Sequence, residues 1–263
     1  GSGVNILSAS LDDEEGQISP DGRKIAFVSE RSGAQQVWVA DADGTSPVQI
    51  TNLDKCEALN VYWSADGNSL FIGARRQREG LLTVRHNLTS RSETTLLTDG
   101  FAAGVSRDGH WLYYHQRSGG QLQLGKLSLQ NGERRRLTHN GGRVARETRD
   151  GQYVIYAKSS VEAGVWRMPT DGTDDQSVQL IPRIHRANLF AVASDGIYFV
   201  SSAEINFPPS LRFFRFSDSR TSTLMTFPKN VFWGLDLSPD ERWLLYSQHD
   251  LAGSDIMLID PLR

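Results

Sequence analysis

The sequence predicts an all-β protein, a six-bladed β-propeller, from a repeated turn, the period of the repeat and the position of one missing strand. The turn is a phrase such as SPDGRKIAF at residues 19–27, in which Asp-Gly favours a tight reversal before a half-buried strand. Five later phrases repeat it, and the shared aspartates are Asp21, Asp66, Asp108, Asp150, Asp195 and Asp240. Their spacings of 45, 42, 42, 45 and 45 residues are typical of propeller blades with four strands each.

Each copy of the repeat divides into four short strands. In the first copy these are EGQIS before the turn, then KIAFVS, QQVWVAD and PVQIT. A second turn separates the last two strands, at Asp43–Gly44, Asn131–Gly132, Asp171–Gly172 and, more loosely, Asp218–Ser219. The fourth strand often ends on a hydroxyl, as in QIT, LLT and RLT. A helical period is absent, so the chain is predicted to be almost entirely β.

The final copy stops after its third strand, DIMLID, and the phrase VNILSAS at residues 4–10 matches a fourth strand. The N-terminal strand, residues 4–10, is therefore predicted to complete the last blade, which residues 231–263 form, by backbone hydrogen bonds. This closure removes open sheet edges. Because no linker separates the copies, residues 4–263 are predicted to be a single propeller, preceded by an expression scar at residues 1–3.

The composition and net charge limit the classes of molecule that this region is expected to contact. A net charge of -3 over 263 residues gives no general attraction to nucleic acid or to an anionic membrane. No apolar run approaches the roughly 18 residues that a membrane span needs. We therefore expect this region to contact neither nucleic acid nor membrane. The single cysteine, Cys56, excludes an internal disulfide.

The SPDG turn, the IAF or LYY strand and the VWVADADG strand resemble the repeats of TolB-like propellers, a WD-type repeat, over essentially the whole chain. Two stretches, GVWRMPTDGTDDQSVQL with GIYFV and the later LLYSQHDLAGSDIMLID, resemble the C-terminal propellers of bacterial one-component transcriptional regulators. Those regulators carry a winged-helix DNA-binding domain, often followed by one membrane helix. The resemblance implies a fragment that acts as a sensor or interaction domain, in a periplasmic or extracytoplasmic location, with the cytoplasm as the alternative. The sixth turn, SPDERW, departs from the repeat because it lacks glycine.

The first strand of each blade is expected to lie at the propeller axis, with alternate side chains toward the channel. Ligand-binding residues are therefore expected on these strands and on the loops that enter them, at the channel and its mouth. The candidates are Glu14, Glu15, Gln17, Asn60, Tyr62, Arg143, Arg146, His185, Arg186, Trp233 and Asp236.

The charges on these first strands and their entering loops differ between the two halves of the chain. The first three blades contribute mainly carboxylates, and the last three mainly cations such as His139, Arg183 and Lys229. A mouth polarised in this way is predicted to orient a protein, a peptide or a dipolar small molecule. The alternative is that the loops pair with one another or stay solvated. Trp233, Tyr62 and Phe101 either offer flat apolar contact or pack the blades.

Glu147 interrupts the apolar positions of its strand. A buried ionised carboxylate is costly unless it is paired, so Glu147 is expected either to have partners or to mark a bulge.

No catalytic residue, cofactor or metal site is predicted. The chain has no GxSxG motif, and Cys56 has no histidine near it in the sequence. The alternatives are a free-standing periplasmic TolB-like scaffold, a lyase with a metal bound by His139, His185 and His249, and the gating part of a peptidase. The basic runs RRQR at 75–78 and ERRRL at 133–137 are predicted to protect strand edges, and NFPPS at 206–210 is an exposed loop.

Overall fold

The computed structural model describes residues 3–7, 12–53, 56–76, 80–158, 161–201, 208–250 and 253–260. Over these residues the chain forms 24 strands in six four-stranded sheets, with one short 3-10 helix. The predicted all-β, six-bladed β-propeller class is confirmed. The chain divides into two compact units, residues 1–102 with 231–263, and residues 103–230. The extent of the single propeller over residues 4–263 stays a prediction.

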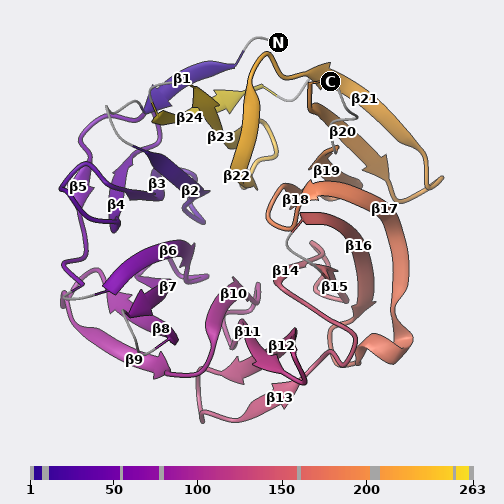
Figure 1. Cartoon of the computed structure of the whole chain (residues 1–263), viewed down its shortest axis with the longest axis horizontal. Helices are drawn as coiled ribbons and strands as arrows, with labels where there is room; N and C mark the ends of the chain where they lie inside the picture. The colour runs from indigo at the N-terminus through magenta and orange to yellow at the C-terminus, as the bar shows by residue number, and fades with distance from the viewer. Residues whose placement is uncertain are drawn as a thin grey trace. The chain divides into compact units, whose positions relative to one another are not determined.

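The first unit holds the first, second and last blades (Figure 1). The first blade consists of β2 (Asp13–Ile18), β3 (Lys24–Ser29), β4 (Gln36–Asp41) and β5 (Val48–Gln49). The second consists of β6 (Cys56–Trp63), β7 (Ser69–Arg76), β8 (Gly80–Asn87) and β9 (Glu93–Leu97). The last consists of β22 (Asn230–Leu237), β23 (Leu244–Asp250), β24 (Gly253–Ile259) and β1 (Val4–Leu7).

The second unit holds the other three blades. The third blade consists of β10 (Phe101–Val105), β11 (Trp111–Ser118), β12 (Gln121–Ser128) and β13 (Arg134–Arg136). The fourth consists of β14 (Val144–Glu147), β15 (Tyr153–Ala157), β16 (Val161–Pro169) and β17 (Val178–Arg186), with the 3-10 helix η1 (Asp174–Gln176) between the last two. The fifth consists of β18 (Phe190–Val192), β19 (Gly196–Val200), β20 (Ser210–Arg215) and β21 (Thr221–Thr226).

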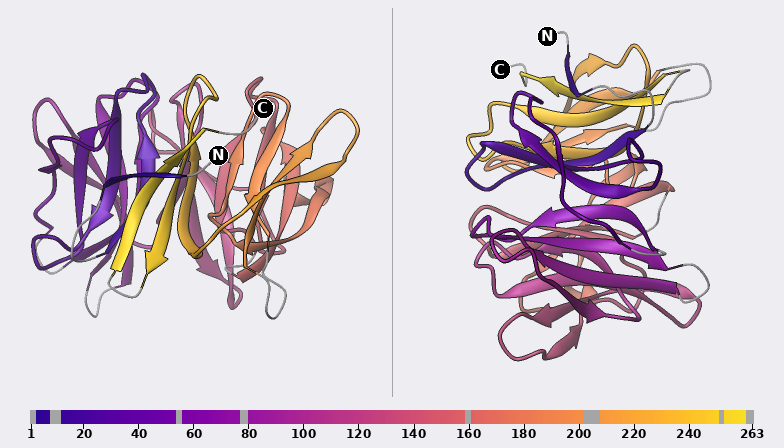
Figure 2. Two further views of the ribbon diagram at one scale, coloured as in Figure 1. Left: turned by 90° about the horizontal axis from the view of Figure 1, so that it is seen from above. Right: turned by 90° about the vertical axis from the view of Figure 1, so that its left-hand side faces the viewer.

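The N-terminal strand completes the last blade, as predicted. The two ends of the colour scale meet there, because β1 lies beside β24 (Figures 1 and 2). The strands are antiparallel, and Val4 pairs with Leu258 and Leu7 with Ile256. Leu7 is buried in the apolar cluster that contains Phe27 of the first blade. Residues 8–10, which the prediction also included, lie outside the described residues.

One hydrogen-bond network explains why the turn phrase repeats. In the first copy the Ser19 hydroxyl donates to Asp21 Oδ1 at 2.6 Å, and the Arg23 N–H donates to the same oxygen at 3.1 Å. The Lys24 N–H then donates to Ser19 Oγ at 2.9 Å. The same bonds recur at Ser64–Asp66, Ser106–Asp108, Thr148–Asp150 and Ser238–Asp240. The Ala193 turn has no such hydroxyl and closes through an Ala193 N–H bond to the Gly196 carbonyl.

The sixth turn keeps its backbone conformation without glycine. Gly22, Gly67, Gly109 and Gly151 have φ values of 69–74° in their turns, and Glu241 has a φ of 59°. This left-handed region is unfavourable for residues with a Cβ atom. The departure noticed in SPDERW is therefore a strained residue in an unchanged turn.

The core residues of the first strands follow the predicted alternation in most blades. Trp63 and Val61 enter the apolar cluster of the second blade, and Phe190 and Val192 enter that of the fifth. Val144 is an exception. It stands two residues before the channel candidate Arg146, so the alternation predicts that it also faces the channel, but it is buried in a cluster with Phe190. Burial of its methyl groups there is more favourable than exposure to water.

Candidate functional site

The candidates of the first unit lie on three first strands. Glu14, Glu15 and Gln17 are on β2, Asn60 and Tyr62 on β6, and Trp233 and Asp236 on β22. The register of β2 shifts between Glu14 and Gln17, and Glu15 has a φ of 53° within this bulge. A Cβ atom on Gly234 would lie 3.2 Å from the Glu15 Cα atom. The bulge therefore brings Glu15 directly against the strand that carries Trp233 and Asp236.

Two of these candidates also connect neighbouring blades. Asp236 Oδ2 accepts a 2.8 Å hydrogen bond from the Ile18 N–H, which joins β22 to β2. The Gln17 carbonyl accepts a 3.1 Å bond from Trp63 Nε1, which joins β2 to β6. Substitution of Asp236 would consequently disturb the blade contact as well as any ligand contact.

Asn60 and Tyr62 are buried within the second blade. Asn60 is 8% exposed; its Nδ2 donates to the Ala102 carbonyl at 2.9 Å and its Oδ1 accepts from the Gly73 N–H at 3.0 Å. Tyr62 is 5% exposed. The amide of Asn60 satisfies backbone groups beside a register shift in β6, which accounts for a polar residue at this position. Ligand contact by these two residues stays a prediction, and their burial does not favour it.

The candidates of the second unit are cationic or titratable. Arg143 precedes β14, Arg146 is on β14, and His185 and Arg186 are on β17. All four side chains are half-buried, as are those of Glu14 and Glu15 in the first unit. The carbonyl of Arg143 accepts a 2.9 Å hydrogen bond from His115 Nδ1. Each unit thus collects charges of one sign among its predicted site residues.

Glu147 is paired, and the bulge alternative is wrong. Its Oε1 accepts a 2.6 Å hydrogen bond from the Tyr113 hydroxyl, and its Oε2 accepts a 2.8 Å bond from the Arg107 N–H. The β14–β15 ladder runs in register from Val144 to Glu147. Burial of the phenol, with the carboxylate beside it, raises the pKa of Tyr113. Glu147 therefore joins the third and fourth blades.

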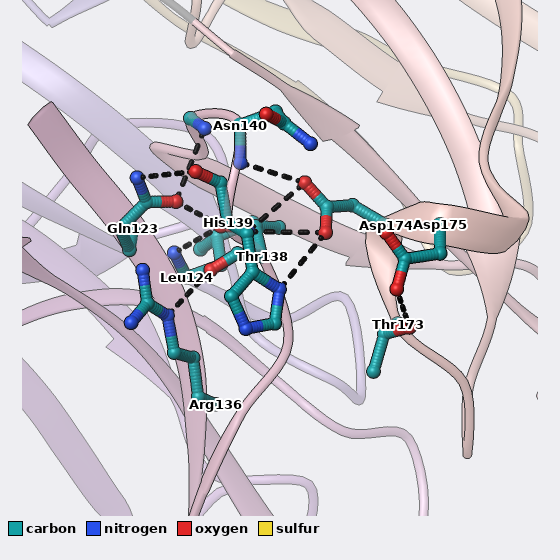
Figure 3. Close-up of polar contacts among 10 residues, drawn as sticks. Gln123, Leu124, Arg136, Thr138, His139, Asn140, Thr173, Asp174 and Asp175 are labelled. Carbon is teal, nitrogen blue, oxygen red and sulfur yellow. Dashed lines mark hydrogen bonds and ion pairs between the residues drawn. The ribbon is translucent and has the colours of Figure 1, made fainter.

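Asp174 of η1 holds the loop that enters the fourth blade (Figure 3). Both of its carboxylate oxygens accept from the His139 N–H at 3.0 Å, and Oδ2 accepts from the Asn140 N–H at 2.8 Å. Burial opposes ionisation of Asp174, but these hydrogen bonds outweigh it and lower its pKa. Sequence reasoning missed Asp174; its only signal was the longer TDGTDDQSV connection of this one copy.

The hydroxyl that ends certain fourth strands has a structural role, visible beside Asp174 in Figure 3. Thr138 Oγ1 donates to Gln123 Oε1 at 2.9 Å and accepts from the Leu124 N–H at 2.8 Å. The Gly141 N–H donates to the same Gln123 oxygen at 3.1 Å. Thr51 and Gln36 form the equivalent clamp in the first blade. The buried side-chain amides of Gln36 and Gln123 therefore hold the ends of the outer strands in place.

The remaining predictions concern metals, membranes and edges. Among the described residues, no group of three or more His, Cys, Asp or Glu side chains could hold a metal, and no helix is long and apolar enough to cross a membrane. The side chain of His249 and residues 202–207 of the proline loop lie outside the described part. The Arg134–Arg136 run forms the edge strand β13, as predicted. Arg75 is instead on the interior strand β7, where it pairs with Glu57.

A bacterial protein is similar in sequence to part of the chain. No family model matches the chain. Over 156 residues, 58% of this chain, it is 25% identical to the uncharacterized peptidase YuxL of Bacillus subtilis. The match covers 23% of that protein, so the chain spans less than a quarter of its relative's length.

Solved structures are similar over nearly the whole chain. TolB from Acinetobacter baumannii matches with a TM-score of 0.76 and 15% identity, over 91% of this chain and 61% of that one. A putative TolB from Agrobacterium tumefaciens matches with a TM-score of 0.70 and 16% identity, over 99% of both chains. An oligogalacturonate lyase in complex with manganese matches with a TM-score of 0.61 and 13% identity, over 96% and 90%. At these identities the likeness concerns the fold, and the fold of this chain is that of a TolB-like β-propeller.

Proposed function

We propose that the chain is a non-catalytic interaction domain that binds a partner protein through charged side chains on its first strands and on the segments that lead into them. The observation that supports this is the separation of charge. The first unit presents half-buried carboxylates at Glu14 and Glu15, and the second presents half-buried cations at Arg143, Arg146 and Arg186.

Such groups suit protein binding for two physical reasons. They are carried by hydrogen-bonded strands or lie next to them, so little backbone conformational entropy is lost when a partner binds. The charges of each unit attract oppositely charged segments of a partner, which raises the association rate. Trp233, half-buried on the same strand as Asp236, adds the kind of aromatic anchor that is frequent at binding hot spots.

Labelled peptides of equal length test the proposal, with basic, acidic, mixed and uncharged sequences compared by fluorescence anisotropy. We expect the basic, acidic and mixed peptides to bind more tightly than the uncharged one. Glu14→Gln with Glu15→Gln should weaken only peptides that contain lysine or arginine. Arg143→Gln with Arg186→Gln should weaken only those that contain carboxylates. Glu133→Gln, beside the edge strand β13, is the matched control; equal binding by all variants would contradict the proposal.

We further propose that the parent protein is a bacterial transcriptional regulator and that this region is its sensor. The resemblance of residues 164–180 and 244–260 to regulator propellers supports this. The coding sequence upstream of this region tests it. A winged-helix domain would support a regulator, and a membrane helix after it would place the propeller outside the cytoplasm. A secretion leader alone would support a periplasmic scaffold.

The likeness to YuxL favours one alternative, in which the chain is the propeller part of a peptidase-like protein. The ligand would then be a peptide on its way to a separate hydrolase domain. A downstream hydrolase domain with a nucleophile elbow would support this alternative over the regulator.

A further inference from the structure

Trp111 and Trp243 occupy the same place in two copies of the repeat, three residues after the turn aspartates Asp108 and Asp240. In the third blade the ring of Trp111 is covered by cations. Lys126 Nζ lies 4.7 Å from the ring centroid and Arg135 Cζ lies 5.1 Å from it. Cations at such distances are attracted to the negative face of an indole.

The Lys126 ammonium occupies a formed site between the third and fourth blades. It donates a 2.8 Å hydrogen bond to the Thr170 carbonyl, and the side chain is almost completely buried. Burial and Arg135 lower the pKa of Lys126, while Glu147, Asp171 and Asp108 act in the opposite direction. One aromatic face and one carbonyl therefore contact this ammonium, and three carboxylates act on it electrostatically.

The equivalent site between the last and first blades lacks the lysine. Lys126 pairs with Tyr113, two residues after Trp111. Leu258 pairs with Leu245, two residues after Trp243. Leu258 thus replaces Lys126. On the neighbouring outer strand, Arg135 pairs with Lys126 in the third blade, and Val4 pairs with Leu258 in the last blade.

Most of the other ammonium partners are retained at this second place. Asp240 corresponds to Asp108. Ala42 corresponds to Thr170, because each donates its N–H to the residue two positions after a turn aspartate. Asp43, next to Ala42, corresponds to Asp171. The exception is Glu147, because the uncharged Ile18 occupies the equivalent position in the first blade.

An open pocket of about 430 Å³ lies where the lysine is missing. Its lining includes Trp243, Leu258, Ala42, Asp43 and Asp240, and no lysine or arginine is among its described lining residues. Trp243 is 37% exposed, which is unusual for a tryptophan outside an interface. The volume is in the range of small-ligand sites.

Two of the carboxylates that line the pocket, Asp43 and Asp240, are held in place and ionised. Asp43 Oδ1 accepts from the Thr45 hydroxyl at 2.6 Å, and Asp240 Oδ1 accepts from the Ser238 hydroxyl at 2.6 Å. These hydrogen bonds lower the pKa of both aspartates. Arg242 lies close enough to Asp240 to lower its pKa further, but it does not line the pocket.

We propose that this pocket binds a primary ammonium group on an alkyl chain, such as a lysine side chain, in the place that Lys126 fills between the third and fourth blades. The ammonium would lie over the Trp243 ring near the Ala42 carbonyl and Asp43, and the alkyl chain would contact Leu258. This site differs from the charged residues of the proposed protein-binding surface and does not depend on that proposal.

Titration with small probes tests the ligand class, with the indole N–H resonance of Trp243 observed by NMR. The probes are Nα-acetyl-lysine methylamide, n-pentylamine and the uncharged Nα-acetyl-norleucine methylamide. We expect saturable binding of both amines, and binding of the norleucine compound about tenfold weaker. Binding of pentylamine alone would assign the pocket to a free amine. Binding of both would admit a lysine side chain. Equal behaviour of all three probes would overturn the proposal.

Two variants test the position of the site. Leu258→Lys supplies an internal ammonium and should reduce amine binding by about tenfold or more, whereas Leu258→Met should retain it. Lys126→Leu combined with Arg135→Val reproduces the residues of the last blade and should create a second site, so that the stoichiometry rises from one amine to two. Unchanged binding by Leu258→Lys would contradict the proposal. If that variant does not fold, Trp243→Leu, with binding followed by isothermal titration calorimetry, gives the answer, because retained binding without the indole would also contradict the proposal.

Discussion

The Tyr113 hydroxyl donates a 2.6 Å hydrogen bond to Glu147 Oε1, from the third blade to the fourth. The second carboxylate oxygen accepts from the Arg107 N–H, so both oxygens of this buried acid are bonded. An acid and a phenol that are both removed from water depend on each other, since each is the other's replacement for solvent.

Tyr113→Phe is expected to destabilise the protein by about 1–3 kcal/mol, because Glu147 Oε1 loses its donor while it stays buried. Glu147→Gln keeps an acceptor for the phenol but adds an amide that needs partners. The double variant should therefore cost less than the sum of the single variants. Urea unfolding measures all three.

Tyr153→Phe serves as the control for loss of a hydroxyl. Tyr153 is half-buried on β15, and its ring contacts Arg167 rather than a buried acid. A cost for Tyr113→Phe no larger than that for Tyr153→Phe would show that the bond to Glu147 contributes nothing.

Glu241→Gly is expected to stabilise the protein by about 1 kcal/mol, because glycine adopts the φ of 59° without a steric cost. A rise in Tm measures it. Gly151→Ala is the reciprocal variant. Gly151 has a φ of 69°, and a Cβ atom there would meet nothing within 4 Å, so any loss of stability comes from the backbone alone. A lower Tm for Glu241→Gly would mean that the glutamate side chain outweighs its strain.

Thr138→Val is expected to cost about 1–3 kcal/mol, because the Leu124 N–H loses its acceptor and Gln123 Oε1 loses a donor inside the protein. Thr98→Val is the matched control. Thr98 ends the phrase LLT as Thr138 ends RLT, but its side chain is exposed, so a change within about 0.5 kcal/mol is expected. Equal costs in thermal or urea unfolding would contradict the clamp.

These two threonines show how far sequence reasoning reaches. The repeat predicted six blades, their strands and the closure by β1, because period and alternation are local properties of the chain. It could not separate Thr138 from Thr98, since the difference depends on a glutamine of the preceding strand. Lys126 and Leu258 raise the same problem. Neither is unusual within its own strand, and their contrast appears only when the register of each blade and the residues of the next blade are known.

The candidate site was predictable to a smaller degree. The charges of Glu15 and Arg146 could be placed on first strands, but the burial of Asn60 and Tyr62 could not. Asn60 is drawn inward by the backbone groups that a register shift leaves unpaired, and sequence alternation does not reveal such a shift. Asp174 was missed because its partners are backbone N–H groups, which carry no sequence signal.

His115 is expected to reduce stability as the pH falls from about 6.5 to about 4. Its side chain is 4% exposed and Nδ1 lies 2.9 Å from the Arg143 carbonyl. Burial, with a smaller effect from the Arg143 charge, lowers its pKa to about 4. The unfolded chain binds a proton near pH 6.5, whereas the folded protein stays neutral until about pH 4. The unfolded state is therefore favoured over this interval, by up to about 3 kcal/mol.

His115→Asn tests this effect, because the amide Nδ2 can donate to the Arg143 carbonyl but does not titrate. Urea unfolding between pH 7.0 and 4.5 (roughly the interval that separates the two pKa values) should give a flatter profile for this variant than for the wild type. Carboxylates with lowered pKa values, such as Asp174, lose their contribution only at lower pH. His110→Asn is the control for loss of an exposed imidazole, which lies beside Asp108. If His115→Asn keeps the wild-type slope, or changes it no more than His110→Asn does, the folded protein does not hold His115 neutral.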